Sequence, residues 1–176
     1  MTTRIKTRII LTGFMGTGKT VVGQALAVKL KHNFLDTDQM IEKKTGRKIE
    51  EIFEKEGEAI FRRMEKKMVR KALSGERLVV ATGGGAVIDP ENLELMKRRG
   101  VLIALTTSPG EILERMQKLD NRPLLRGEDK MGKIKKLLSK RSPFYQQADQ
   151  IIDCSGKGVI AIVEEIVKRL NENINR

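Results

Sequence analysis

Short apolar runs recur along the chain and predict buried strands. They occupy residues 9–12, 34–36, 78–82, 101–105 and 150–153. Between them, apolar residues recur every three or four positions, which is the spacing of one face of a helix. Strands that alternate with helices predict an α/β fold whose mostly parallel sheet is covered on both faces, because each parallel pair needs a crossover connection.

Apolar stripes mark one short turn and three longer helices, the last of which follows the final strand. They are Val22, Ala25, Leu26 and Leu30; the turn at Ile49, Ile52 and Phe53; Phe61, Met64, Met68 and Ala72; and Ile160, Val163, Ile166, Val167 and Leu170. Two further helix starts are marked by capping sequences. Asp89 precedes a first-turn Pro90, and Ser108-Pro109-Gly110-Glu111 fits a capping box.

One long irregular stretch interrupts the pattern. Residues 122–132 contain Pro123, Gly127 and three consecutive charged residues. A loop of this length in a compact domain is usually functional or disordered. We therefore predict a mobile lid at about residues 122–132.

Length and composition indicate a globular protein with a basic surface. The 176 residues include 35 Lys plus Arg and 23 Asp plus Glu, which leaves a formal net charge of +12. This length is ordinary for a single domain, so we expect one domain over residues 1–176. The positive charge favours anionic partners. Aromatic residues make up only 3% of the chain, which leaves few side chains to stack on bases and argues against nucleic acid.

Cys154 is the only cysteine and His32 the only histidine. They exclude an intramolecular disulfide, a Cys/His zinc cluster and a Ser/His/Asp triad built around a second histidine. We expect Cys154 to be an inert strand residue. The first apolar run is too short for a signal-peptide core, and no run is long enough to span a membrane. The expected location is the cytoplasm.

A phosphate-binding motif follows the first predicted strand directly. Gly13-Phe14-Met15-Gly16-Thr17-Gly18-Lys19-Thr20 matches G-x-x-x-x-G-K-[ST] and leads into a helical pattern. Its glycines let backbone N–H groups turn toward phosphate, Lys19 reaches the terminal phosphates, and the Thr20 hydroxyl can ligate Mg²⁺. The motif predicts a nucleoside triphosphate with Mg²⁺, but it does not identify the phosphoryl acceptor.

The acid that usually completes such a site is missing from the end of the third predicted strand, which runs into Gly83-Gly84-Gly85. Asp36 and Asp38 close the second strand instead, and residues two apart in an extended segment point to the same side. Asp36 is a candidate for outer-sphere contact with the metal, and Asp38 for orienting an acceptor hydroxyl. The alternative is that the pair caps a helix beginning near Gln39.

Five further segments complete a specific combination. They are Asp36-x-Asp38, Phe61-Arg62-x-x-Glu65, Ala81-Thr82-Gly83-Gly84-Gly85, Arg122-Pro123-Leu124-Leu125 and Arg141-x-Pro143-x-Tyr145. Together with the phosphate loop, they resemble the shikimate kinase family in the same order over nearly the whole chain. The resemblance implies the P-loop fold of the nucleoside monophosphate kinases, with a five-stranded parallel sheet in the order 2-3-1-4-5 and a lid. It also implies transfer of the ATP γ-phosphoryl group to the 3-hydroxyl of shikimate.

The resemblance further implies roles for individual residues on the nucleotide side. Lys19, Asp38 and Arg122 would be catalytic, and Thr20 and Asp36 would hold Mg²⁺. Arg115 would lie on the adenine, while the lid would bring Arg122 over the phosphates. The residues that would bind ATP are Gly13, Met15, Gly16, Thr17, Gly18, Lys19, Thr20, Arg115 and Arg122.

On the acceptor side, the resemblance places a substrate-binding segment at about residues 37–65. Arg62 and Arg141 would bind the shikimate carboxylate, since a planar guanidinium matches a carboxylate with two hydrogen bonds. Glu65 would orient Arg62, and Phe53 and Phe61 would wall the pocket. The residues that would bind shikimate are Asp38, Arg62, Gly83, Gly84, Gly85 and Arg141.

Three other functions compete with this interpretation. A gluconate-type kinase of the same fold would carry a His-Pro segment soon after the second-strand acid, where this chain has Gln39-Met40-Ile41-Glu42. A non-catalytic nucleotide-sensing domain would have lost Lys19, Asp38 or Arg141, and all three are present. A nucleic-acid-binding module would reveal itself in a binding assay at moderate salt. We expect a monomer that binds shikimate and ATP and does not bind nucleic acid or membrane.

Overall fold

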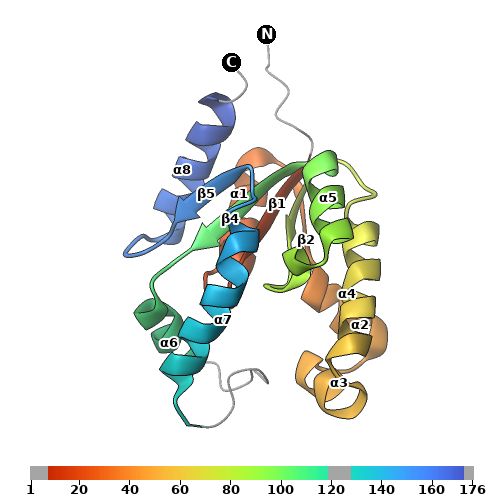
Figure 1. Cartoon of the computed structure of the whole chain (residues 1–176). Helices are drawn as coiled ribbons and strands as arrows, with labels where there is room; N and C mark the ends of the chain where they lie inside the picture. The colour runs from red at the N-terminus through yellow and green to blue at the C-terminus, as the bar shows by residue number, and fades with distance from the viewer. Residues whose placement is uncertain (1–7, 119–127, 173–176) are drawn as a thin grey trace.

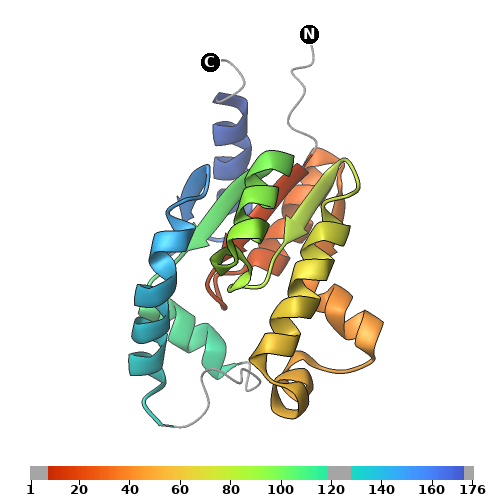
Figure 2. The ribbon, with the colours of Figure 1, turned by 45° about the vertical axis from the view of Figure 1, so that its right-hand side comes forward.

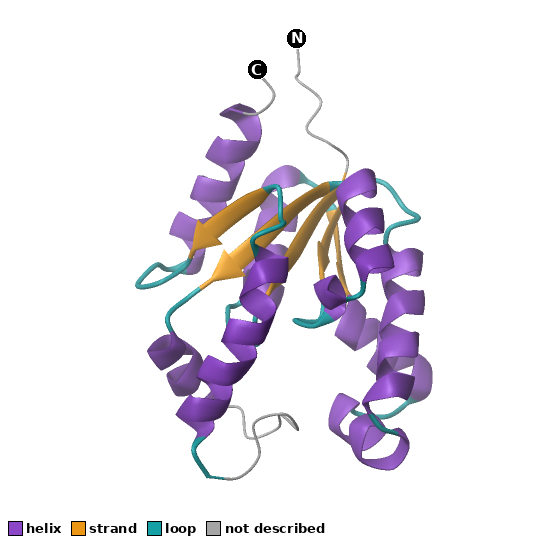
Figure 3. Cartoon of the chain, in the orientation of Figure 1, coloured by secondary structure: helices purple, strands orange, loops and turns teal. Residues whose placement is uncertain are grey.

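A five-stranded parallel sheet forms the centre of the protein, and helices cover both of its faces (Figures 1 and 3). The computed structural model describes residues 8–118 and 128–172. The strands are β1 (Arg8–Gly13), β2 (Asn33–Asp36), β3 (Leu78–Ala81), β4 (Val101–Thr106) and β5 (Gln150–Asp153). They lie in the order β2-β3-β1-β4-β5, which confirms the expected topology. Each strand end lies within one residue of the bound predicted from the apolar runs.

The connections between the strands are mainly helical. They contain α1 (Lys19–Leu30), α2 (Thr37–Thr45), α3 (Ile49–Glu56), α4 (Glu58–Ala72), the 3-10 helix η1 (Ala86–Ile88), α5 (Pro90–Arg99), α6 (Pro109–Gln117) and α7 (Lys130–Tyr145), and α8 (Val159–Glu172) follows β5. Within the described residues, none of these helices combines the length and the apolar composition that crossing a membrane would require.

Alternate residues of the strands pack against two separate groups of helices. Ile9 and Leu11 of β1 lie in a cluster with buried residues of α1 and α8, whereas Ile10 lies with residues of α4, α5 and α7. Successive side chains of a strand point to opposite faces, so one strand contributes to both layers. Figures 1 and 2 show α5 and α7 on one face of the sheet and α1 and α8 on the other.

The capping sequences behave largely as predicted. The Asp89 carboxylate accepts hydrogen bonds from the backbone N–H groups of Glu91 and Asn92, at 2.9 and 3.2 Å. Ser108 caps α6 by accepting from the backbone N–H of Glu111 at 3.2 Å. The second half of the expected capping box is different, because the Glu111 carboxylate accepts hydrogen bonds from Thr107, Arg115 and Gly156.

Three helical segments differ from the sequence prediction. The expected turn at Ile49 is the helix α3, whose first N–H donates to Glu42 Oε1 of another helix at 3.1 Å. The irregular stretch ends earlier than expected, since α7 begins at Lys130 and Asp129 accepts a hydrogen bond from the N–H of Gly132. In α8, Ile160 was expected in the buried stripe but is 75% exposed. Ile162 is buried in its place.

Cys154 lies directly after β5 and not within it, which corrects the expectation of a strand residue. Its side chain is fully buried, and its backbone N–H donates to Thr106 O at 2.8 Å. Burial raises the pKa of the thiol to about 11. A thiol that stays protonated at neutral pH is a poor nucleophile, so an inert Cys154 is consistent with the structure.

Candidate active site

The loops at the carboxyl ends of the strands hold most of the residues that the sequence identified. The phosphate loop follows β1, the Asp36 segment follows β2, and the three glycines follow β3. These strands are neighbours in the sheet, so the three loops meet at one edge. Helices α3 and α4 on one side and α6 and α7 on the other extend past the strand ends around this edge (Figures 1 and 2).

The phosphate loop has a backbone suited to an anion. Gly16 and Gly18 have φ values of 79° and 90°, a conformation that glycine adopts without steric cost. Gly18 immediately precedes α1, whose first-turn N–H groups have no partner within the helix and can therefore bind phosphate. Lys19 Nζ donates to the carbonyl oxygens of Gly13 and Phe14 at 2.8 and 2.9 Å. The ammonium group therefore lies over the loop.

Asp36 caps a helix with one carboxylate oxygen and contacts Thr20 with the other. Its Oδ1 caps α2 by accepting from the N–H groups of Asp38 and Gln39, at 2.9 and 3.2 Å. Its Oδ2 accepts from the Thr20 hydroxyl at 2.8 Å. A hydroxyl and a carboxylate oxygen are the ligands that Mg²⁺ takes. Asp36 and Thr20 thus fit a metal beside the phosphate loop.

Asp38 lies in a helix and not in the extended segment that was expected. The strand β2 ends at Asp36, so Asp38 lies in the first turn of α2 and not two residues along an extended segment. It nevertheless lines the same cleft as Asp36, Lys19 and Thr20, which has a volume of about 380 Å³. Asp36 is the cap of α2, so the capping alternative does not account for the Asp38 carboxylate.

A second pocket adjoins the nucleotide-side cleft. Its walls include Arg62, Arg141, the three glycines after β3, and Phe53 and Phe61, whose rings lie 4.6 Å apart between centroids. Asp38, Met15, Ile49 and Gly84 line both cavities. Asp38 therefore lies where a group bound in one cavity would meet a group bound in the other.

Arg62 is held by carboxylates of its own helix. Its Nη1 donates to Glu65 Oε2 at 2.7 Å, and its Nη2 donates to Glu58 Oε1 at 3.0 Å. The expected contact between Glu65 and Arg62 is therefore present. The guanidinium also lies against Gly85, where a Cβ atom would be only 2.5 Å from Nη1. A side chain at position 85 would displace the guanidinium of Arg62.

Arg141 enters the same pocket from α7. It is only 5% exposed, and its guanidinium carbon lies 5.7 Å from the centroid of the Phe14 ring. One turn later, Tyr145 donates its hydroxyl to Gly84 O at 2.6 Å. Burial raises the pKa of Tyr145 to about 12, so the phenol remains a donor.

The sequence interpretation assigned no role to Tyr145. The available signal was its spacing of four residues from Arg141, which places both side chains on one face of a helix. Two residues on one face of α7 thus lie beside the three glycines: Arg141 lines the same pocket, and Tyr145 donates its hydroxyl to Gly84 O.

Of the two remaining arginines predicted in the site, the structure describes only Arg115. Arg115 lies on α6, and its Nη1 donates to Gly16 O of the phosphate loop at 3.0 Å. It is therefore beside the nucleotide-side cleft. Arg122, and with it residues 122–127 of the expected lid, lies outside the described residues.

Glu65 is buried between arginines and a second carboxylate, and it is only 1% exposed. Burial is the largest influence and raises the pKa of Glu65 from 4.5 to about 7, against the opposing effect of the Arg62 charge. The negative charge of Asp38 adds to the rise, and Arg141 opposes it. Glu65 therefore titrates near neutral pH.

We expect this titration to be visible in protein stability. Between pH 4.5 and about 7 the folded protein binds more protons at Glu65 than the unfolded chain does, so this group lowers the free energy of unfolding as the pH rises. Relative to Glu65→Gln, the wild type should lose stability across this window, and the difference should level off above it. Urea unfolding of both proteins from acid to neutral pH measures the difference. A difference that does not vary with pH would contradict the raised pKa.

Comparison with known proteins agrees with this geometry. The family model described as shikimate kinase matches residues 15–171. The chain is 47% identical to the shikimate kinase of Caldanaerobacter subterraneus subsp. tengcongensis, over 91% of this chain and 94% of that one. It is similar to the structure of shikimate kinase from Acinetobacter baumannii in complex with shikimate, with a TM-score of 0.91, 40% identity and coverage of 94% and 93%.

A gluconokinase from Sinorhizobium meliloti 1021 shares the fold, with a TM-score of 0.64 and coverage of 98% and 95%, at only 16% identity. That likeness extends to the fold alone, whereas the matches to shikimate kinases extend to the sequence over nearly the full length. This chain belongs to the shikimate kinase family.

Proposed function

We propose that this protein transfers the γ-phosphoryl group of ATP to the 3-hydroxyl of shikimate. The observation that carries the proposal is the position of Asp38, which lines both the phosphate-loop cleft and the pocket that contains Arg62 and Arg141. A phosphoryl group in the cleft and an acceptor hydroxyl in the pocket would meet at this carboxylate. Membership of the family supports both ligands.

The nucleotide side requires neutralisation of phosphate charge. The N–H groups of the phosphate loop and the first turn of α1 would bind the β- and γ-phosphates, with Gly13, Met15, Gly16, Thr17 and Gly18 shaping the loop. Lys19 would move its ammonium from the loop carbonyls to the phosphate oxygens, where negative charge develops during transfer.

Mg²⁺ fits the pair formed by the Thr20 hydroxyl and the Asp36 carboxylate. Among the residues that the structure describes, no three His, Cys, Asp or Glu side chains cluster as a metal site. Phosphate and water oxygens would therefore complete the coordination. When bound, the ion would neutralise phosphate charge.

The acceptor side requires a bound carboxylate and a correctly aimed hydroxyl. Arg62 and Arg141 both line the pocket and would each offer two parallel N–H donors to the shikimate carboxylate. Gly83, Gly84 and Gly85 would present backbone N–H groups to the ring hydroxyls. Asp38 would orient the 3-hydroxyl and accept its proton on a carboxylate oxygen. Closure of the lid with Arg122, the monomeric state and the cytoplasmic location stay predictions.

ADP formation with shikimate, with gluconate and with no acceptor tests the proposal. We expect ADP release to depend on shikimate, and phosphorus NMR of the product to show one phosphomonoester at the 3-position. Equal rates with no acceptor would indicate a simple ATPase and would overturn the proposal. A preference for gluconate would favour the alternative kinase.

Replacement of the two carboxylate-binding arginines should separate the two ligands. Arg62→Lys and Arg141→Lys should each weaken shikimate binding roughly tenfold or more and spare ATP binding, because lysine keeps the charge but cannot form two parallel hydrogen bonds. Titration calorimetry with each ligand alone measures both affinities. Arg63→Lys, at the exposed neighbouring position of α4, is the matched control. Unchanged shikimate affinity in both variants would remove the carboxylate assignment.

A further inference from the structure

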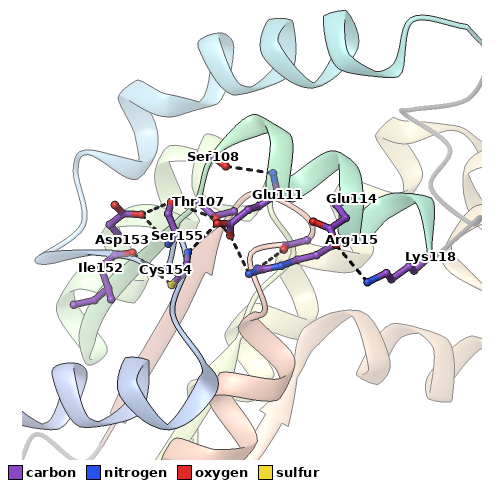
Figure 4. Close-up of polar contacts among 12 residues, drawn as sticks. Thr107, Ser108, Glu111, Glu114, Arg115, Lys118, Ile152, Asp153, Cys154 and Ser155 are labelled. Carbon is purple, nitrogen blue, oxygen red and sulfur yellow. Dashed lines mark hydrogen bonds and ion pairs between the residues drawn. The ribbon is translucent and has the colours of Figure 1, made fainter.

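A hydrogen-bond network joins α6 to the loop between β5 and α8 (Figure 4). At its centre is the carboxylate of Glu111. Its Oε1 accepts from the backbone N–H of Gly156 at 2.8 Å. Its Oε2 accepts from the Thr107 hydroxyl at 2.6 Å and from Arg115 Nη2 at 3.2 Å. One side chain thus receives donors from three residues, two of its own segment and one of the loop after β5.

Glu111 occupies a position where a local role was expected. It is the third residue of α6, and a glutamate there commonly bonds back to the N–H of the capping residue, here Ser108. The Glu111 carboxylate is instead bonded to Gly156, which is 45 residues away in the sequence. Its hydrogen bonds therefore stabilise the arrangement of separate segments and not only the start of one helix.

Arg115 extends the network to the phosphate loop. The same guanidinium that donates to Glu111 through Nη2 donates through Nη1 to Gly16 O at 3.0 Å. Gly16 in turn lines the nucleotide-side cleft. A continuous path of hydrogen bonds therefore runs from Gly156 through Glu111 and Arg115 to the loop that would bind the phosphates.

The charged groups near Glu111 have other partners, and Glu111 forms its ion pair with Arg115. Lys157, the cation of the loop between β5 and α8, pairs with Glu165 at 2.7 Å, and Asp153 accepts from the N–H and hydroxyl groups of Ser155. The Thr107 hydroxyl, the Gly156 N–H and the Arg115 charge lower the pKa of Glu111. The carboxylate is therefore ionised at neutral pH, when its attraction for the guanidinium is strongest.

We propose that Glu111 is a positioning residue for the nucleotide. It holds Arg115 against the phosphate loop and fixes the Ser155–Gly156 turn, so that this side of the phosphate loop is ordered before ATP binds. A long side chain that is already ordered loses less conformational entropy on binding, which increases affinity without adding a contact. This inference rests on the proposed function for the placement of ATP, but not for the identity of the acceptor.

Glu111→Gln tests the inference with little change in shape. The amide can still accept from Gly156, but it has one acceptor oxygen in place of two and no charge for Arg115. We expect the Kd for Mg-ADP, measured by titration calorimetry, to rise roughly tenfold, since hydrogen bonds to charged groups are stronger than neutral ones. KM for ATP should rise in parallel, while kcat and KM for shikimate should stay within about twofold of the wild type.

Glu114→Gln is the matched control. Glu114 is on the same helix and its side chain is 70% exposed, with Lys118 at 3.6 Å as its ion-pair partner (Figure 4). The Kd for Mg-ADP, the KM for ATP, kcat and the KM for shikimate should all be unchanged in this variant. A Glu111→Gln protein that has a lower thermal midpoint but the wild-type affinity for Mg-ADP would show a purely structural role and would overturn the inference.

A double-mutant cycle tests whether Glu111 acts through Arg115. In an Arg115→Ala background, Glu111→Gln should cause a clearly smaller further loss of Mg-ADP affinity than it does in the wild type. Fully additive losses would contradict the proposed route. The ADP titrations contain no acceptor, so their outcome is distinguishable from failure of the proposed function, which would appear as ADP formation that does not depend on shikimate.

Discussion

Lys19→Ala should abolish shikimate-dependent ADP formation and leave the fold intact. The Lys19 ammonium lies within 2.9 Å of the carbonyl oxygens of Gly13 and Phe14, close enough to turn toward phosphate. Charge developing on the transferred group would lose the cation of the phosphate loop, and loss of one such donor lowers turnover by roughly 10² to 10³ or more. The backbone of the loop, which shapes the site, would remain.

A coupled ADP assay and circular dichroism together measure this result. Lys29→Ala is the control, because Lys29 lies on the exposed face of the same helix α1. It should keep full turnover. If Lys19→Ala retained full activity with unchanged ATP affinity, the phosphate-loop interpretation would be wrong.

Asp38→Asn should lower turnover by roughly 10² to 10⁴, the range associated with general acid–base catalysis. An amide can still contact the acceptor hydroxyl, but it cannot accept the proton. A loss of only about 10² would mean that Asp38 acts mainly by orienting the hydroxyl, since a loose transition state requires little from a base. The thermal midpoint should change little, because Asp36 and not Asp38 caps α2.

Asp89→Ala is the control for the loss of a helix cap in the same protein. Asp89 caps α5 with two backbone hydrogen bonds, and its removal should cost about 1 kcal/mol of stability while turnover is kept. Steady-state kinetics and thermal unfolding of both variants separate the two cases. If Asp38→Asn lost stability and kept its turnover, Asp38 would be a structural residue.

Local features of this protein could be predicted from the sequence because they depend on residues close together in the chain. The strand runs matched to within one residue. The central strands β1, β3 and β4 are buried on both faces of the sheet and must therefore be apolar along their length. The phosphate loop needs only its own glycines and the helix that follows. The Asp89 cap needs only the next three residues. The order of the strands was implied by the resemblance to the shikimate kinase family, because apolar runs alone do not specify which strands are neighbours.

Contacts between distant segments were decided only by the tertiary structure. The sequence left Asp36 between a cap and a metal contact. The fold shows that one oxygen caps α2 and that the other accepts a hydrogen bond from Thr20, which the tertiary structure brings near. Glu111 was expected to cap its own helix, but the parallel pairing of β4 with β5 brings Gly156 within reach. Arg115 meets Gly16 across 99 residues for the same kind of reason. A polar side chain bonds to whichever partner the packing brings near it, and that depends on the whole fold and not on its neighbours in sequence.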